Sequence, residues 1–532
     1  MMVLRRNISI FAAATAVAGA LHFQFACAGS QRERIEQPGA IERPERPNAI
    51  ASRAKNVILF LGDGMGISTV TAARILEGQL RGESGEENQL SFDRFPDVAL
   101  IKVYNTDQQT PDSAGTMTAI VTGEKTRAGV LSIDALIERG DFSRANAHRL
   151  ETIVELAEDR GRSTGLVTTT SVTHATPAAL YAHSPERNWD SDTTMTPEAR
   201  AADFPDIARQ LIEFSHGDGL EVVLGGGEQH FRPDGPTTSA LWPRLKEPAI
   251  TRSDGRDLTE EWLANRSGSA FVRTCSEIEN LDTAKTSHLL GLFAANHLRF
   301  EADRENDLPC QPSLTQMMLT ALEILERNPL GYFLMVEGGR IDHGHHGANA
   351  FRALTDTIEF ARAVGVAAER TSADDTLIVV TADHGHVFNI GGYPTRGNDI
   401  LGLTINNDHR GRPAEEPALD ALGLPFTTLG YQNGPGYTGM SRDQPEGSKF
   451  HPHRTRVFGG ITQGRPDLTN VDTADPDYLQ EGAVPLSSET HSGEDVAVYA
   501  RGPGSRLFHG VQEQNYIYHA MVEALGWNQP AE

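Results

Sequence analysis

The sequence predicts an α/β fold, a three-layer sandwich with a largely parallel central sheet and helices on both faces. Two observations support this. Short runs of consecutive apolar residues recur along the chain, with helical stretches between them. A continuous apolar run is typical of a strand buried on both faces, and strands that alternate with helices favour a parallel sheet.

The expected strands cover residues 57–61, 100–104, 165–167, 222–224, 333–336, 376–380 and 496–500. The expected helices cover residues 67–80, 150–160, 314–327 and 350–370. Residues 395–485 break this alternation, because they are rich in Gly, Pro, Asn and Asp and have little periodicity. We therefore expect a catalytic α/β domain in two parts, 51–394 and 486–532, interrupted by a loop-rich subdomain at 395–485 with some short strands of its own.

The first 28 residues have the pattern of a signal peptide. Arg5 and Arg6 precede a mostly apolar run at 8–21, which is too short to span a bilayer comfortably, and Ala26 and Ala28 offer a cleavage site. Residues 29–50, rich in Arg, Glu and Pro, are expected to form a loose N-terminal arm. The polar C-terminal stretch carries no lipid-anchor signal. We expect an exported protein, periplasmic or extracellular, without a membrane anchor.

The charge balance restricts the possible partners. The chain has 72 acidic and 47 basic residues, a formal net charge of -25. Proteins that bind duplex nucleic acid need a basic surface, so no nucleic-acid partner is expected. An acidic protein that handles an anionic substrate must concentrate positive charge locally, through metal ions or a few arginines.

Cys275 and Cys310 are the two cysteines of the chain after residue 28. In an exported protein such a pair forms one disulfide or remains as two buried thiols, and the sequence leaves both open.

Potential metal ligands follow several of the expected strands. Asp63 follows the first strand, Glu337 follows the run at 333–336, and Asp383 and His384 follow the run at 376–380. Ligands bind beyond the carboxyl ends of the strands in open α/β sheets. These side chains are therefore expected at one edge of the sheet.

Further ligands lie near the second of these strands. Asp342 and His346 are four residues apart, so one helical turn places both on the same face. Mixed imidazole and carboxylate ligands suit zinc, and oxygen ligands suit magnesium. Two divalent ions about 4 Å apart form a clamp used in phosphoryl transfer. His491 precedes the expected strand at 496–500, and taken alone it is weak evidence for a metal site.

A nucleophile and an anion-binding side chain are also available. Ser113 lies at the start of a small-residue helix, where unpaired N–H groups favour an anion, although Asp112 or Ser113 taken alone also reads as an N-cap. Arg187, taken alone, also fits a surface arginine. Thr176 offers an oxygen ligand.

Five motifs together resemble the alkaline phosphatases. They are Gly-Asp-Gly-Met-Gly at 62–66, Pro-Asp-Ser-Ala-Gly-Thr at 111–116, Val-Glu-Gly-Gly-Arg-Ile-Asp-His-Gly-His-His at 336–346, Thr-Ala-Asp-His-Gly-His at 381–386 and Glu-Thr-His-Ser-Gly-Glu-Asp-Val-Ala-Val at 489–498. The resemblance runs from about residue 56 to residue 526, and details such as His-Ala-Thr-Pro at 174–177 fit the animal-type branch.

The resemblance implies an enzyme that hydrolyses phosphate monoesters through a phosphoserine at Ser113, with Arg187 holding two phosphate oxygens. It implies two zinc ions and one magnesium ion per subunit, a homodimer, and a crown-like role for the insertion at 395–485. The first zinc would bind Asp342, His346 and His491, and the second Asp63, Asp383 and His384. Magnesium would bind Asp63, Thr176 and Glu337, with His174 and His343 in its outer shell. His345 and His386 receive no role beyond packing or hydrogen bonding.

The chain departs from the animal-type pattern at an additional calcium site. Ala294 and Gln311 stand where acidic ligands are expected, so we do not expect bound calcium. Two alternatives remain open. One is a related hydrolase acting on diesters or sulfates, although Pro111 to Ala114 do not match the sulfatase motif. The other is an exported metal- or phosphate-binding protein without turnover.

Overall fold

The structure is a computed structural model that describes residues 53–234, 251–306, 310–437, 465 and 467–527. The predicted signal peptide 1–28 and arm 29–50 lie outside the described residues, as do 438–464 of the predicted insertion. Within the described ranges, every helix is too short or too polar to cross a bilayer.

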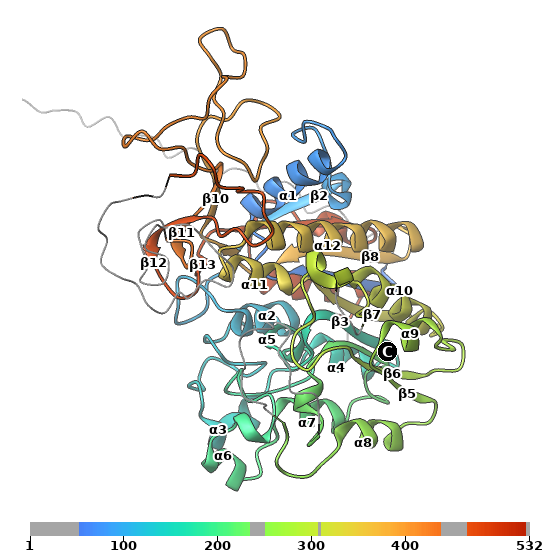
Figure 1. The fold of residues 1–532 in the computed structure, drawn as a ribbon. Helices are drawn as coiled ribbons and strands as arrows, with labels where there is room; N and C mark the ends of the chain where they lie inside the picture. The colour runs from blue at the N-terminus through green and yellow to red at the C-terminus, as the bar shows by residue number, and fades with distance from the viewer. Residues whose placement is uncertain (1–52, 235–250, 307–309, 438–464, 466, 528–532) are drawn as a thin grey trace, which may run out of the picture. The chain divides into compact units, whose positions relative to one another are not determined.

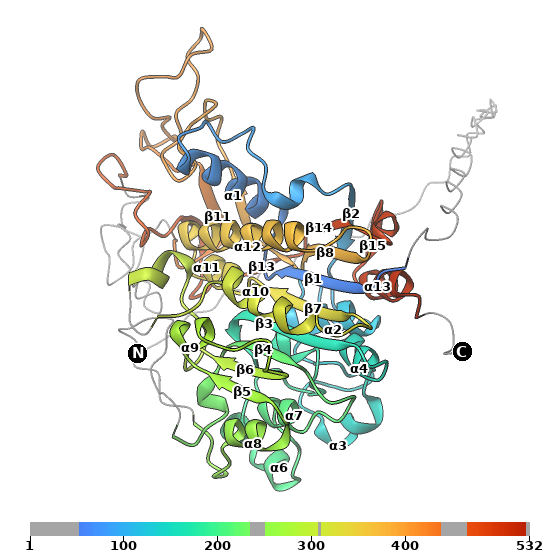
Figure 2. The same cartoon turned by 90° about the vertical axis from the view of Figure 1, so that its right-hand side faces the viewer.

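A ten-stranded sheet forms the centre of the fold (Figure 1), in the order β15-β2-β14-β8-β1-β7-β3-β4-β6-β5, which can be followed in Figure 2. Neighbouring strands are parallel, except that β14 is antiparallel to both β2 and β8. The strands are β1 (Asn56–Gly62), β2 (Asp97–Lys102), β3 (Ser163–Ser171), β4 (Val222–Gly226), β5 (Ser269–Val272), β6 (His288–Leu292), β7 (Tyr332–Glu337), β8 (Thr376–Ala382), β14 (Val496–Arg501) and β15 (Val511–Glu513). The predicted, largely parallel sheet is confirmed.

The central strands are covered on both faces. Every residue of β1, β3, β7 and β8 is buried, and because successive side chains point to opposite faces, both faces must be packed. Helices α10 and α12 contact these strands, as do α4 and α13 (Figure 2). The helices of eight or more residues are α1 (Ile67–Leu80), α2 (Ser113–Thr122), α8 (Leu258–Asn265), α10 (Leu314–Leu325), α12 (Ala350–Arg370) and α13 (Tyr516–Leu525). The shorter α-helices are α3 (Phe142–Ala145), α4 (Ile153–Glu158), α5 (Ala175–Ala178), α6 (Pro197–Ala201), α7 (Ile207–Ile212), α9 (Cys275–Glu279) and α11 (Arg340–His346).

Three strands of the large sheet were not predicted. β5 and β15 are short edge strands with partly exposed residues, so they lack a clear apolar pattern. β6 contains Gly291 between its leucines, which interrupts the apolar run. Pairing with their neighbours, a tertiary effect, is what makes these segments strands.

Smaller sheets lie beside the large one. β10 (Phe388–Ile390), β11 (Leu429–Gly434) and β12 (Glu481–Pro485) form a three-stranded sheet, and β9 (Gly385–His386) pairs with β13 (His491–Ser492). β11 and β12 belong to the predicted insertion, whereas β10 precedes it. The boundaries of that insertion stay a prediction.

A disulfide joins Cys275, at the start of α9, to Cys310 across a sequence separation of 35 residues. The structure thus favours the disulfide over the two free thiols that the sequence left open.

Candidate active site and metal centre

The strand register brings the predicted ligands to one edge of the sheet. In β1, Leu61 lies opposite Glu337 of β7, and Gly62 lies opposite Ala382 of β8. Asp63, Glu337 and Asp383 therefore stand at the ends of three adjacent parallel strands. All three side chains are fully buried.

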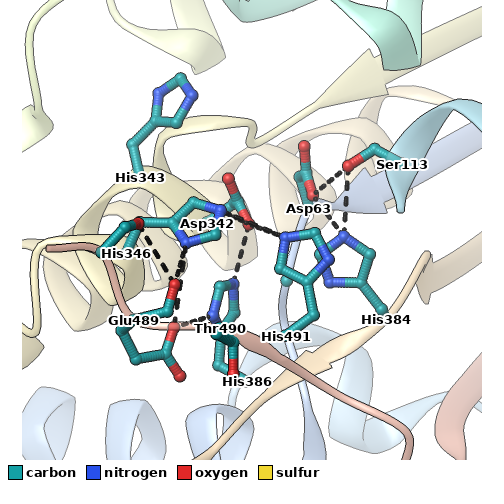
Figure 3. A network of polar contacts seen from close by, with 12 residues as sticks. Asp63, Ser113, Asp342, His343, His346, His384, His386, Glu489, Thr490 and His491 are labelled. Atoms are coloured by element: carbon teal, nitrogen blue, oxygen red, sulfur yellow. Dashed lines mark hydrogen bonds and ion pairs between the residues drawn. The ribbon is translucent and has the colours of Figure 1, made fainter. Parts of the chain in front are cut away.

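A first group of ligands comes from α11 and β13. Oδ1 of Asp342 lies 3.4 Å from Nε2 of His346 and 3.4 Å from Nε2 of His491, and the two histidine nitrogens are 3.1 Å apart (Figure 3). The pairing of β13 with β9 delivers His491 from far along the chain. The three predicted ligands of the first zinc are thus brought together.

Backbone carbonyls orient both histidines of this group. Nδ1 of His346 lies 2.6 Å from the carbonyl oxygen of Glu489, and Nδ1 of His491 lies 2.8 Å from that of Pro111. A carbonyl only accepts hydrogen bonds, so Nδ1 carries the proton and Nε2 keeps its lone pair. This is how proteins present imidazole to a metal ion.

A second group consists of Asp63, Asp383 and His384, with ligand atoms within 4.8 Å of one another. Nε2 of His384 lies 3.2 Å from Oδ2 of Asp383 and 3.5 Å from Oδ1 of Asp63. These three residues are the predicted ligands of the second zinc.

A third group lies on the other side of Asp63. Oδ2 of Asp63 is 3.4 Å from Oγ1 of Thr176. The ligand atoms of Asp63, Glu337 and His174 lie within 4.8 Å of one another. Hydroxyls of Thr168 and Thr170 donate to Oε2 of Glu337, while Oε1 is buried without a hydrogen-bond partner among the described residues. An orphaned carboxylate oxygen in such surroundings fits a cation ligand.

The predicted nucleophile lies between these groups. Ser113 begins α2, and its Oγ is 3.2 Å from Nε2 of His384 and 3.5 Å from Oδ1 of Asp63. Asp112 caps the helix by accepting the N–H of Gly115, 3.1 Å away. Arg187 is not a free surface arginine. Its Nη1 is 3.0 Å from Oδ2 of Asp112, and its Nη2 is 3.2 Å from Nε2 of His174.

Known proteins resemble this chain in sequence and in fold. A model of the alkaline phosphatase family matches residues 54–527. The chain belongs to the alkaline phosphatase family. It is 44% identical over 475 residues to an alkaline phosphatase of Gadus morhua, with 89% of this chain and 92% of the relative covered. It is 45% identical over 475 residues to the human tissue-nonspecific isozyme, with 88% and 83% covered.

The solved alkaline phosphatase of Thermus thermophilus has the same fold. Its TM-score is 0.62 at 25% identity, with 90% of this chain and 93% of that chain covered. These likenesses confirm the predicted family, the fold and the activity, hydrolysis of phosphate monoesters. They also identify a metal-dependent enzyme, in agreement with the ligand groups of the site.

The electrostatics of the site match such a metal-dependent family. Burial, Asp383 and Asp342 raise the pKa of Asp63 well above its usual range. Burial raises the pKa of Glu337 to about 8. Carboxylates crowded together in a dry site repel one another, and divalent cations are the groups that relieve this repulsion.

Two histidines without a predicted role have defined partners. Nε2 of His386 is 2.8 Å from Oδ1 of Asp342, and its Nδ1 is 2.5 Å from Oε2 of Glu489. Despite burial, the two carboxylates raise the pKa of His386 to about 10. His345 lies between Oγ1 of Thr69 and the hydroxyl of Tyr431, at 2.9 and 2.7 Å. Their rings also stack on each other with centres 4.8 Å apart, so both histidines combine hydrogen bonding with packing.

Sequence reasoning missed three contributors to this part of the alkaline phosphatase site. Glu489 holds His386, Asp112 holds Arg187, and His297 packs on His343 with ring centres 4.4 Å apart. Glu489 belongs to the motif at 489–498, and the sequence indicates Asp112 only as a helix cap. His297 lies in the segment 293–298 that follows β6, and no local sequence pattern indicates a role for it.

At the predicted departure from the calcium pattern, Oε1 of Gln311 accepts the N–H of Arg299 at 2.8 Å. Ala294 is buried and offers no side-chain oxygen. The expectation that calcium does not bind stays a prediction.

Proposed function

We propose that this enzyme hydrolyses phosphate monoesters through a phosphoserine at Ser113, with two zinc ions and one magnesium ion in the three ligand groups. The position of Ser113 carries the proposal. Its Oγ lies between His384 and Asp63, and Asp63 belongs to two of the ligand groups.

The metal assignment follows the chemistry of each group. Asp342, His346 and His491 would hold one zinc, and Asp63, Asp383 and His384 the other, because both groups mix imidazole with carboxylate. Asp63, Thr176 and Glu337 would hold magnesium through oxygen ligands, with His174 and His343 around them. When bound, these ions supply the positive charge that neutralises a phosphate dianion and lowers the pKa of a nearby hydroxyl or water.

The chain's own residues support both halves of the reaction. Arg187 points a guanidinium at the start of α2, where it would bind two phosphate oxygens as a planar fork. The N-terminus of α2 adds backbone N–H groups beside Ser113. Ser113 Oγ would attack phosphorus as the alcohol leaves on the opposite side. Water would then cleave the phosphoserine, giving inorganic phosphate and restoring the serine.

Trapping the intermediate tests this proposal. Brief reaction with a ³²P-labelled monoester followed by acid quench should place the label on the peptide that contains Ser113. Ser113→Ala should abolish labelling and lower kcat/KM by roughly a thousand-fold, since a nucleophile and its surroundings act as a unit. Label on another residue, or a fully active variant with normal metal content, would overturn the nucleophile.

We further propose that the enzyme is exported and acts as a homodimer. The disulfide between Cys275 and Cys310 supports an oxidising compartment, and the dimer rests on the resemblance alone. Fractionation of the native host and light scattering of the purified protein test the two points separately.

A further inference from the structure

Arg340 is a fully buried arginine at the start of α11, two residues before Asp342. Its guanidinium lies 3.8 Å from the centre of the Phe300 ring, and its backbone N–H donates to Oγ1 of Thr169 at 3.1 Å. Among the described residues its Nε and Nη2 have no hydrogen-bond partner. Burying an arginine costs free energy unless its N–H groups are paired, so the one hydrogen bond that this side chain makes is informative.

That hydrogen bond runs to His343, from Nη1 of Arg340 to Nδ1 at 2.8 Å. A guanidinium has only N–H donors, so Nδ1 must be the acceptor and carries no proton. The single proton of a neutral imidazole must then lie on Nε2. Arg340 therefore determines which nitrogen of His343 donates and leaves that ring no free lone pair for a metal ion.

The neighbours of His343 indicate what this donor serves. Figure 3 shows its ring turned away from the zinc-ligand cluster. The ring contacts His174, with ring centres 5.5 Å apart, and His174 belongs to the third ligand group and accepts from Arg187. His297 packs on the same His343 ring, with ring centres 4.4 Å apart. Thus His343 lies next to His174, which accepts from the proposed phosphate-binding Arg187, and it is partly exposed.

We infer that Arg340 is a positioning residue for substrate binding: it makes His343 an obligate Nε2–H donor that hydrogen-bonds the phosphate anion, instead of a metal ligand. This inference rests on the proposed function of the site. A phosphate dianion has only acceptor oxygens, so a histidine that can only donate suits it, and a histidine free to present a lone pair does not.

The tautomer of His343 can be measured directly. In histidine-selectively ¹⁵N-labelled enzyme loaded with zinc and magnesium, long-range ¹H–¹⁵N spectra, assigned with His343→Gln, should show the proton on Nε2. Arg340→Lys keeps a donor and should preserve this tautomer. Arg340→Met removes the donor and should lose it.

Binding of inorganic phosphate provides the second readout, at verified metal content. Its inhibition constant should rise about ten-fold in Arg340→Met, roughly the worth of one hydrogen bond to an anion, and change little in Arg340→Lys. Arg352→Met is the matched control, because Arg352 is also buried near Phe300 but bonds Asp303 and Asp477. It should leave both readouts unchanged.

Three results would overturn the inference. They are a wild-type His343 with its proton on Nδ1, an Arg340→Met enzyme with unchanged tautomer and phosphate affinity, and an equal loss of phosphate affinity in Arg352→Met. If Arg340→Met does not fold, the wild-type tautomer and Arg340→Lys still decide the matter. An enzyme that forms no phosphoserine would still report the tautomer, so the two proposals fail separately.

Discussion

Oδ2 of Asp112 lies 3.0 Å from Nη1 of Arg187, so the residue before the proposed nucleophile also holds the proposed phosphate-binding arginine. The same carboxylate accepts N–H groups from Gly115 and Gly129 at 3.1 and 2.8 Å. Although burial opposes it, Arg187 and these N–H groups lower the pKa of Asp112. The side chain therefore fixes the helix start and the guanidinium together.

Asp112→Asn should weaken phosphate binding while preserving most of the helix cap. The amide oxygen can still accept from Gly115, but without the negative charge Arg187 loses its fixed orientation. We expect the inhibition constant of phosphate to rise about three- to ten-fold, because a ligand group that is no longer preorganised binds less tightly. Asp112→Ala should in addition lose about 1 kcal/mol of stability with the cap. Unchanged phosphate inhibition in both variants would contradict the role of this pair.

His491→Ala should contain about one zinc ion fewer per subunit than the wild type, since the two remaining ligands of its group are too few for tight binding. The activity of this variant at ambient zinc should fall together with its zinc content. Zinc content is measured by mass spectrometry after dialysis. The control is His509→Ala, which removes an exposed histidine outside the ligand groups. Equal zinc content in the two variants would rule out His491 as a ligand.

Glu158→Gln should stabilise the protein at alkaline pH. Burial and the neighbouring Glu221 raise the pKa of Glu158 to about 9. Because the unfolded chain ionises near pH 4.5, stability is fully present below that pH and is lost as pH rises towards 9. Glutamine mimics the neutral acid and escapes this loss, so it should gain at least about 1 kcal/mol at pH 8.

The measurement is denaturant unfolding of both proteins at pH 5 and pH 8, with the gain confined to the higher pH. Thr164, which donates to Glu158, and the nearby Arg266 and Asp218 also face this carboxylate and are left intact. Glu369→Gln, at an exposed glutamate, should show no such difference between the two pH values. A destabilised Glu158→Gln at pH 8 would mean that the buried carboxylate is ionised in the folded protein.

Removing the disulfide should destabilise the protein without altering the chemistry. A loop of 35 residues closed by a cross-link contributes about 3 to 4 kcal/mol in the chain-entropy account. Cys275→Ser with Cys310→Ser should therefore lower Tm, while KM stays near the wild-type value where both fold. If treatment with a reductant leaves the Tm of the wild type unchanged, the bond is absent or contributes nothing.

The sequence alone was sufficient where local pattern decides structure. The helices at 67–80 and 350–370 have the predicted bounds, and in the longer of the two an amphipathic period repeats over many residues. Asp63, Glu337 and Asp383 were expected at one edge because each follows a buried run, and parallel strands deliver their carboxyl ends together. Family motifs supplied the remaining proposed ligands and the activity.

Tertiary structure alone decided the contacts between segments far apart in the chain. Arg187 meets Asp112 across 75 residues, His386 meets Glu489 across 103, and His297 meets His343 from a loop without any pattern. A hydrogen bond requires its donor and acceptor to be placed to within a few tenths of an ångström, and sequence periodicity does not encode that precision. The sequence thus identified the proposed metal ligands, the nucleophile and the anion-binding arginine, whereas tertiary packing determined which further side chains join them and which nitrogen or oxygen of each one faces its partner.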